Sequence, residues 1–402
     1  MLALSCVPGH APAQVAPSYG ELLRRSLDNA PVLLEQAANL RAARGDARQT
    51  HAYPNPSVGV EVENLGARAM PGDASQRQTT MTLTQPFEIG GKRSARIALG
   101  EAGVVAANAR SREVEVRFAA ELANAYATGE AAQQRLTLAD EDVARANEDL
   151  RAADALVKAG KEANLRVAQA RASVSAAIAA REAAKADLTE ALANLSALVG
   201  AAEPYTAIDT SILRVATPPV PAVGPSLEDS PSIVRAKAER DAVAAQVRVE
   251  QVRPVPDLGL SGGLRRFGGT NETAFVVGLS ATIPLFDNNR GAVAAAQERR
   301  AAADQRLAAV RLEANAARLA ALAQVTAADG RLKAAGDGEA AADEAYRLGR
   351  TGYDAGKTSL LELLTLRRAL TDAKSLTIES RLAKVRALSA LARADGRLAF
   401  GE

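Results

Sequence analysis

The side chains that most often bind metals or carry out catalysis are scarce in this chain. His10 and His51 are its only histidines, and Cys6 is its only cysteine. We expect His10 to be removed with an export signal. With a single cysteine, one chain then cannot assemble the three or four nitrogen and sulfur ligands of a zinc site. No pair of nucleophile and general base is recognisable either. We therefore expect a protein that is not an enzyme, uses no cofactor and coordinates no metal itself.

Two short motifs resemble ligand-binding loops but lack essential parts of them. Gly90-Gly91-Lys92 has no upstream glycine of the kind that a phosphate-binding loop requires. Asp337-Gly338-Glu339 is not preceded by the alternating oxygen ligands of a calcium loop. The net charge is +2, with 24% charged residues, so the chain has no basic excess to suggest binding to nucleic acid.

The first residues have the pattern of an export signal. Ala11-Pro12-Ala13, followed by Gln14, has the small-residue spacing of a signal-peptidase site. We expect residues 1–13 to be the remnant of a signal peptide. The sequence before Cys6 also resembles a lipoprotein cleavage box, so whether Cys6 is lipidated or removed stays open. No run approaches 18 apolar residues, and we expect no transmembrane helix.

The chain repeats itself after about 200 residues, which predicts its organisation. The segment 54–60 returns as 254–260, and the segment 159–161 returns as 355–357. We expect a first repeat at 14–200, a proline-rich linker at 201–226 and a second repeat at 227–402.

Each repeat contains two segments in which apolar residues alternate with small or polar ones. They predict strands at about 56–64, 79–88, 257–266 and 274–284. Strands of about ten residues with one apolar face suit an outer-membrane barrel, whereas a soluble sandwich would have to bury Gly, Ser, Thr and Glu. Four strands cannot close a barrel, and open edges in lipid leave backbone groups unsatisfied. Three copies would supply twelve strands, so we expect a homotrimer.

Long helical stretches follow each pair of strands, at Lys92–Lys158 and Arg290–Tyr353. Either would extend about 95–100 Å if unbroken. Leu136, Val143, Leu150 and Val157 form a seven-residue series, so we expect coiled-coil hairpins with tips at 156–165 and 352–361. We also expect one helix from Ser18 to Thr50, capped by Ser18, and a kink or break near Ala328–Gly338, where three glycines cluster.

These features together resemble the TolC-like outer-membrane factor family of outer membrane efflux proteins. The resemblance covers the chain after Ala13 and rests on the tandem repeat, the Pro-x-Pro segments before the first strand of each pair, the two tips and the strand ends at 85–93 and 283–287. The sequence Glu-Ile-Gly-Gly-Lys-Arg at 88–93 is especially similar to the heavy-metal efflux branch. The resemblance implies a mostly α fold with some β: a homotrimer whose twelve-stranded outer-membrane β-barrel is continuous with a periplasmic α-helical barrel.

The resemblance also implies roles for residues at the tips. Tyr353 and Asp354 match a motif in which the tyrosine helps to hold the periplasmic entrance shut. Glu362 matches the first of two acidic positions at the constriction, but Thr365 stands at the second, which leaves one carboxylate per chain. A ring of carboxylates in a narrow pore favours cations. The implied docking ends for a periplasmic adaptor carry the residues Gly160, Lys161, Leu165, Gly356, Lys357 and Leu361.

The implied function is that of an outer-membrane exit duct in a tripartite efflux system, which conducts its substrate passively from the periplasm to the outside. Its partners would be two further copies of itself, a periplasmic adaptor (membrane fusion protein), an inner-membrane pump of the resistance-nodulation-division type and outer-membrane lipid. The cargo stays open between heavy-metal cations and other small toxic compounds. Alternative functions are a soluble periplasmic coiled-coil scaffold or adaptor, or the outer-membrane channel of a type I secretion system.

Overall fold

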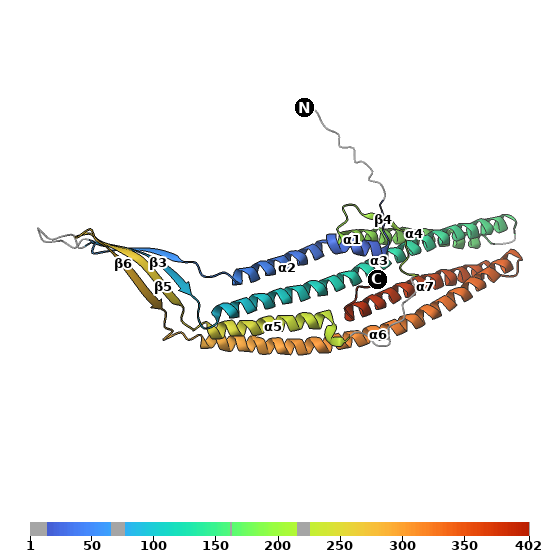
Figure 1. The fold of residues 1–402 in the computed structure, drawn as a ribbon. Coiled ribbons are helices and arrows are strands. Elements are labelled where there is room, and N and C mark those ends of the chain that lie inside the picture. The colour runs from blue at the N-terminus through green and yellow to red at the C-terminus, as the bar shows by residue number, and fades with distance from the viewer. Residues whose placement is uncertain (1–13, 66–76, 161–162, 215–225, 402) are drawn as a thin grey trace, which may run out of the picture. The chain divides into compact units, whose positions relative to one another are not determined.

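The computed structural model describes residues 14–65, 77–160, 163–214 and 226–401. The predicted signal segment with Cys6, the tip residue Lys161 and linker residues 215–225 lie outside the described residues. The elements follow one another as β1 (Gln14–Ala16), α1 (Tyr19–Asn29), α2 (Pro31–Thr50), β2 (Ser57–Glu63), β3 (Gln78–Phe87), α3 (Lys92–Lys158), α4 (Asn164–Val199), β4 (Tyr205–Ile208), the short helix η1 (Leu227–Asp229), α5 (Pro231–Val252), β5 (Leu258–Phe267), β6 (Thr273–Ala281), α6 (Arg290–Asp354) and α7 (Leu360–Ala394) (Figure 1).

The chain forms two compact units, and each contains parts of both sequence repeats. The first unit comprises the described residues up to Gln36, Arg112–Pro231 and those from Leu312 onward; the second comprises Ala37–Ser111 and Ser232–Arg311. The first unit holds the two hairpin tips, and the second holds the four long strands.

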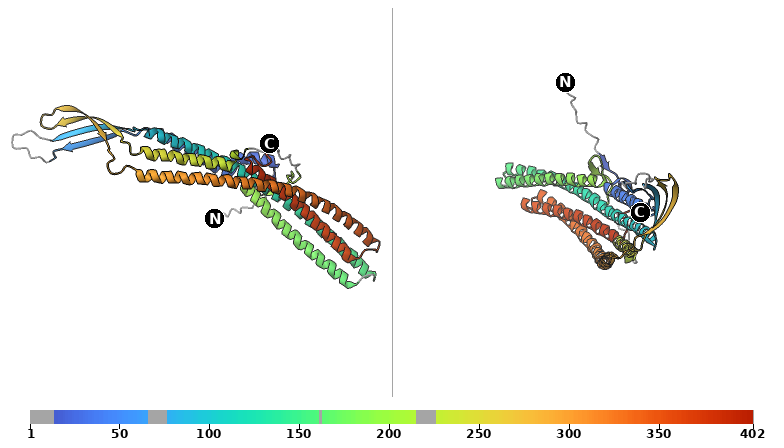
Figure 2. Two further views of the ribbon diagram at one scale, coloured as in Figure 1. Left: turned by 90° about the horizontal axis from the view of Figure 1, so that it is seen from below. Right: turned by 90° about the vertical axis from the view of Figure 1, so that its left-hand side faces the viewer.

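The four strands of the second unit form one antiparallel sheet in the order β2-β3-β5-β6 (Figure 2). A row of paired residues crosses the whole sheet, from Val60 to Met81, then to Leu264 and Phe275. All four side chains are exposed. Because side chains alternate between the two faces of a strand, these residues mark a continuous apolar face. The period-two pattern of the sequence therefore predicted the strands and their apolar face correctly.

The opposite face of the sheet is built from small and polar residues at close approach. Gly59 pairs with Thr82, and Thr82 pairs with Gly263. A Cβ atom at Gly263 would lie only 2.2 Å from the Met81 carbonyl oxygen, so this position accommodates no side chain without a shift of β3. No described helix is long and apolar enough to cross a membrane.

The core of the first unit gathers aromatic and leucine side chains around the middle of α3. Phe118, Leu122 and Tyr126 are fully buried there, and Tyr19 of α1 belongs to the same cluster. The Tyr126 hydroxyl donates to the Thr210 carbonyl oxygen over 2.9 Å. Glu130, one turn further along α3, accepts hydrogen bonds from the backbone N–H groups of Ile212 (2.8 Å) and Leu213 (3.0 Å). These bonds fasten the chain that follows β4 to the side of α3.

The two repeats end their helical hairpins with the same contact. Gly200 adopts a φ of 70° at the end of α4, and a Cβ atom there would lie 2.9 Å from the Pro31 ring. Gly396 after α7 adopts a φ of 72°, with the same distance to the Pro231 ring. Only glycine combines this left-handed conformation with so close a neighbour, so the duplication extends to atomic packing.

The expectation of one helix from Ser18 to Thr50 is wrong. The Ser18 side chain does cap the first turn by accepting from the Glu21 N–H group over 3.4 Å. The helix ends at Asn29, however, and Ala30 is extended with a ψ of 130°. Pro31 explains this break, because a proline disfavours helical geometry at the residue before it.

The expected break near Ala328–Gly338 is also wrong, since α6 continues as one helix to Asp354. Gly330, Gly336 and Gly338 lie on the exposed side of α6. The buried side carries Ala328 and Ala335, and the Thr377 hydroxyl of α7 donates to the Ala335 carbonyl oxygen over 3.3 Å. Packing against α7 thus outweighs a cost of about 1 kcal/mol per glycine.

Candidate functional site

The tips of both hairpins turn on a glycine in the left-handed conformation. Gly160 has a φ of 68° and Gly356 a φ of 71°, and a Cβ atom at either position would meet open space. The N–H group of Gly356 donates to the Tyr353 carbonyl oxygen (2.9 Å), and that of Lys357 donates to Gly352 (2.7 Å). These bonds satisfy carbonyl groups that the end of α6 would otherwise leave unpaired. Glycine is favoured at these two positions by the left-handed backbone conformation, and not by a neighbour that would leave no room for a Cβ atom.

Each tip carries one large apolar side chain in solvent. Leu165 in the first turn of α4 is 64% exposed, and Leu361 in the first turn of α7 is 57% exposed. The two leucines occupy equivalent positions of the repeat. Exposed leucines at equivalent ends of two hairpins form a surface that a partner could cover.

Glu362 and Thr365 lie on the same exposed side of α7, as their spacing of three predicts. Ser359 caps the helix by accepting from the Glu362 N–H group over 3.2 Å, which fixes the backbone of this turn. The Thr365 hydroxyl donates back to the Leu361 carbonyl oxygen over 2.9 Å. Of these two positions, only Glu362 therefore presents a charge to solvent.

Tyr353 and Asp354 have different surroundings although they are neighbours in sequence. Tyr353 packs against a cluster in which Ala153 and Ala170 of the first hairpin meet Leu360 of the second. Asp354 is exposed and forms an ion pair with Arg350 over 3.5 Å. Tyr353 therefore packs against a cluster to which both hairpins contribute, whereas Asp354 pairs with a residue of its own helix.

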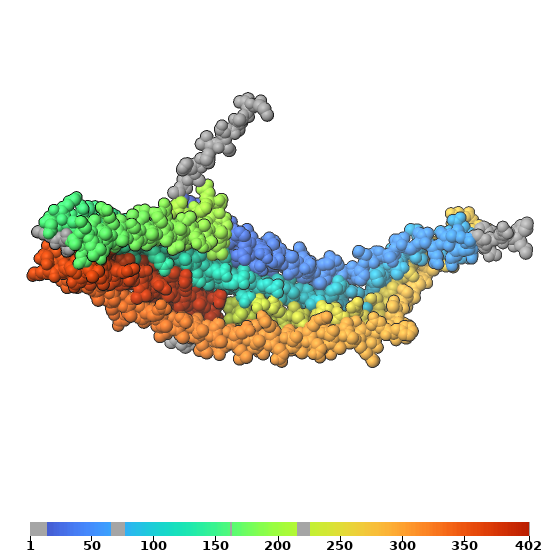
Figure 3. Space-filling view, turned by 180° about the vertical axis from the view of Figure 1, so that it is seen from behind, coloured from blue at the N-terminus to red at the C-terminus, as the bar shows by residue number. Residues whose placement is uncertain are grey.

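A buried ion pair between the hairpins was not predicted from the sequence. The Arg367 guanidinium of α7 donates to the Asp149 carboxylate of α3 over 2.8 Å, and the two side chains are 6% and 1% exposed. Arg367 also donates to the Ser173 hydroxyl of α4 over 2.6 Å, and Arg350 lies 3.5 Å from Asp149. Burial raises the pKa of the Asp149 carboxyl, and the charges of Arg367 and Arg350 act against this shift. Figure 3 shows the first hairpin (green) packed against the second (orange to red) at the end that carries the tips.

The polar contacts between α3 and α7 continue away from the tips. Arg367 lies 3.5 Å from Asp142, and the Thr371 hydroxyl lies 3.3 Å from the same carboxylate. One turn further on, Lys374 lies 3.5 Å from Glu141. The acidic residues stand on α3 and the basic residues on α7, so these contacts hold one register between the two helices.

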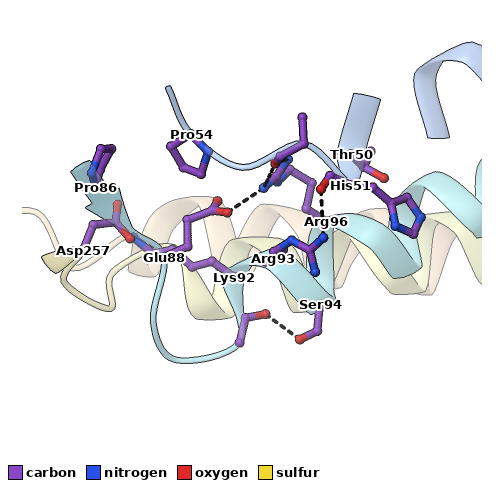
Figure 4. Close-up of polar contacts among 12 residues, drawn as sticks. Thr50, His51, Pro54, Pro86, Glu88, Lys92, Arg93, Ser94, Arg96 and Asp257 are labelled. Atoms are coloured by element: carbon purple, nitrogen blue, oxygen red, sulfur yellow. Dashed lines mark hydrogen bonds and ion pairs between the residues drawn. The ribbon is translucent and has the colours of Figure 1, made fainter. Parts of the chain in front are cut away.

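The strand-end motif at 88–93 connects the sheet to the helices (Figure 4). Arg96 forms an ion pair with Glu88 over 2.5 Å and donates to the Ala52 carbonyl oxygen over 3.2 Å. Arg93 donates to the His51 carbonyl oxygen over 2.8 Å, and Lys92 forms an ion pair with Asp257 over 2.9 Å. These side chains hold the segments before β2 and β5 against the segment after β3. The motif therefore has a structural role, connecting the strands to the helices, and it contains no cluster of metal ligands.

The comparisons with known proteins place the whole chain among efflux components. It is 57% identical over 98% of its length to the nickel-cobalt-cadmium resistance protein NccC of Alcaligenes xylosoxydans xylosoxydans, of which it covers 90%. It is 57% identical over 97% of its length to the nickel and cobalt resistance protein CnrC of Cupriavidus metallidurans, of which it covers 93%. The solved structure of CusC superposes with a TM-score of 0.82 at 19% identity, covering 94% of this chain and 92% of that one.

The sequence profile of the outer membrane efflux proteins matches residues 22–201 and 223–397, one match for each repeat. These findings confirm the predicted fold, the location in the outer membrane with an extension into the periplasm, and the function of an efflux exit duct. They favour that duct over the soluble scaffold and the secretion channel, and members of this kind are passive channels rather than enzymes. The chain belongs to the outer membrane efflux protein family.

Proposed function

We propose that this chain is the exit duct of a tripartite system that exports nickel, cobalt or cadmium ions. The family works as a trimeric channel with an adaptor and an inner-membrane pump. The observation that carries the proposed cargo is the 57% identity, over almost the whole chain, to two proteins named for resistance to nickel and cobalt. A pump of the resistance-nodulation-division type would supply the energy, and lipid would surround the apolar face of the sheet.

The hairpin tips are the proposed gate of this duct. Opening an entrance bounded by the tips requires one hairpin to move relative to the other. Asp149 and Arg367 oppose such a movement, because separating them would leave two buried charges without partners. Tyr353 packs against the cluster that Ala153 and Ala170 of the first hairpin form with Leu360 of the second. Both interactions lie between hairpins rather than within one, which supports their assignment to the resting gate.

Glu362 is the proposed source of charge at the constriction. Three copies would bring three carboxylates together near the axis of the trimer. Fixed negative charge at a narrow point raises the local concentration of cations and repels anions. Such a ring suits a metal cation as cargo. It would act through its charge, without binding the ion directly as a set of metal ligands.

The exposed tips are the proposed docking ends for the adaptor. Gly160 with Leu165 and Gly356 with Lys357 and Leu361 give each chain two similar ends, and Lys161 extends the first in sequence. Leucine would supply apolar contact and lysine would supply charge complementarity. A trimer would then present six similar ends to the adaptor.

Growth of a bacterial strain that lacks its own metal exit duct tests the proposed function. The strain should carry the matching adaptor and pump, and growth should be measured over a series of nickel, cobalt and cadmium concentrations. We expect the chain to restore growth on these metals and to be recovered as a trimer from the outer membrane. Trimer in the outer membrane with tolerance restored only to organic toxins would refute the metal cargo. Recovery as a soluble monomer would refute the duct itself.

A further inference from the structure

The sheet has two strand edges that carry unpaired backbone groups. In the order β2-β3-β5-β6, the outer edge of β2 and the outer edge of β6 have no partner within the described part of the chain. Successive strands are antiparallel throughout. β6 of one copy and β2 of the next would therefore also run antiparallel if they met.

The two hairpins of the sheet repeat each other in register. Aligning the Pro-x-Pro segments before β2 and β5 makes Leu258 the counterpart of Val58. Aligning Pro86 with Pro284 makes Ala281 the counterpart of Leu83. Val58 pairs with Leu83 in the first hairpin, and their counterparts pair in the second. The sequence alignment thus reproduces an observed pairing, which shows that β2 corresponds to β5 and β3 to β6 residue by residue.

The chain path after the two exit strands is equivalent as well. Gly91 has a φ of 83°, and Asn289, its counterpart in the same alignment, has a φ of 57°. The N–H group of Ala95 donates to Gly91, and that of Val293 donates to Asn289, each over 3.0 Å. The correspondence therefore extends beyond the strands into the first turn of α3 and α6.

We infer that β6 pairs with β2 of a second copy of this chain in the register that β3 and β5 show within one copy. The β3–β5 ladder places Phe87 opposite Leu258. Transferred through the repeat, this pair becomes Leu285 opposite Val58 of the second copy. The same ladder then places Ile283 opposite Val60 of the second copy. This inference specifies the closure of the proposed duct and rests on that function.

The inferred register keeps each face of the sheet uniform. Ile283 and Val60 would both lie on the apolar face, and Thr282 would stand opposite Glu61 on the small and polar face. A slip by one residue would place Ile283 opposite Glu61 and mix the two faces. A slip by two residues preserves the faces, so the repeat, and not the pattern of hydrophobicity, selects among registers.

The register also accounts for the difference in length between equivalent strands. β3 continues to Phe87, whose counterpart is Leu285, but β6 ends at Ala281. The end of β3 pairs with β5. The equivalent residues Thr282–Leu285 have no corresponding strand beside them within the described part of one copy. Ile283 and Leu285 are 69% and 76% exposed. Pairing with a second copy would extend β6 by these four residues.

Cysteine pairs test the register in intact trimers in the outer membrane. The variant Val60→Cys/Ile283→Cys should form disulfides when diamide oxidises the two thiols. Within one chain β2 and β6 are three strand spacings apart, about 14 Å, which is beyond the reach of a disulfide. Each cross-link must therefore join two copies and give covalent dimers and trimers in denaturing gels. The variants with a single new cysteine control for reactions of Cys6.

Two further pairs serve as matched controls for the register. Val60→Cys/Ala281→Cys and Val60→Cys/Leu285→Cys have the same face and the same chemistry but are displaced by two residues. We expect the Ile283 pair to cross-link about tenfold faster, because directly opposite residues are closer than diagonal ones. Faster cross-linking of either displaced pair in an intact trimer would overturn the register alone. Failure to recover any trimer would overturn the register together with the duct.

Discussion

The Asp149 carboxylate on α3 lies 2.8 Å from the Arg367 guanidinium on α7, and the pair joins the hairpins of the two repeats. It occurs only once in the duplicated chain. The counterpart of Asp149 in the second repeat is Ala345, although the counterpart of Arg367 in the first repeat is Arg171. A buried charge pair contributes little net stability, because desolvation offsets its attraction. Its value here lies in specifying one arrangement of the hairpins.

Removing the carboxylate should loosen this arrangement. In Asp149→Ala, Arg367 keeps only the weaker contacts with Asp142 and Ser173, and loss of one partner of a buried pair costs about 3–5 kcal/mol. We expect conductance through the trimer in planar bilayers to rise severalfold, and cells to become more sensitive to large antibiotics. Asp154→Ala is the matched control, since the ion pair of Asp154 with Lys158 lies on the surface. Wild-type conductance of an intact Asp149→Ala trimer would contradict the gate.

Much of the fold could be predicted because its signals are local. Alternation with period two reflects the two faces of one strand, and the tandem repeat of the sequence is visible without knowledge of any contact. The cap at Ser18 and the turns at Gly160 and Gly356 depend on residues within a few positions of each other. The unbroken path of α6 past Gly330 depends instead on packing against α7, so local propensity gave the wrong result.

The Asp149–Arg367 pair could not be predicted for the same reason. Its partners are 218 residues apart in sequence, and their contact depends on how two hairpins pack. The seven-residue series through Leu150 indicated a seam between two helices. In the structure Leu150 is half-buried, whereas Ala146, Asp149 and Ala153 are buried. Asp149 binds Arg367 of α7, and Ala153 packs with Ala170 of α4, so α3 contacts both hairpins. The one available signal in the sequence was the position of Asp149, a charged residue next to Leu150 of the predicted helix contact.

A second acidic residue at the constriction should strengthen its preference for cations. Thr365 is exposed on the same side of α7 as Glu362, so Thr365→Glu would add three carboxylates to the proposed ring. We expect the ratio of cation to anion permeability to rise severalfold in Thr365→Glu and to fall in Glu362→Ala. Reversal potentials in salt gradients measure both ratios. Glu344→Ala, which removes an exposed carboxylate paired with Arg347 on α6, should leave them unchanged.

Changing the exposed leucines of the tips should uncouple the duct from its adaptor. Leu165→Ser/Leu361→Ser replaces two leucines that are mostly exposed and lie outside the core of one chain, so the trimer should remain stable. We expect growth on nickel to fall to the level of a strain without the duct, and cross-linking to the adaptor to be lost. Leu312→Ser, at an exposed leucine of α6, is the control. Full metal tolerance in the double variant would exclude these leucines from docking.

Adjacent glycines of β5 should differ sharply in their tolerance of a methyl group. At Gly263 a Cβ atom would lie 2.2 Å from the Met81 carbonyl oxygen, whereas at Gly262 it would meet nothing within 4 Å. Gly263→Ala should destabilise the sheet by about 1–3 kcal/mol per chain through overpacking. The temperature at which the trimer dissociates in denaturing gels should fall for Gly263→Ala and stay constant for Gly262→Ala. Equal temperatures for the two variants would show that this face is not closely packed.

The inferred contact between copies lacks an ion pair that its equivalent within one copy contains. Lys92 pairs with Asp257 over 2.9 Å, and the counterparts of these residues are Arg290 and Ser57. Ser57→Asp should therefore create an ion pair with Arg290 of the neighbouring copy. Exposed pairs contribute up to about 1 kcal/mol each, and a trimer would contain three of them.

We expect Ser57→Asp to raise the dissociation temperature of the trimer, and we expect Arg290→Ala to abolish this gain. The double variant Ser57→Asp/Arg290→Ala separates the proposed pair from any general effect of a carboxylate at this position, because it keeps the new charge and removes only its partner. An equal gain in both backgrounds would mean that the new carboxylate acts on another group. The strands of neighbouring copies would then meet in a different register from that of β3 and β5.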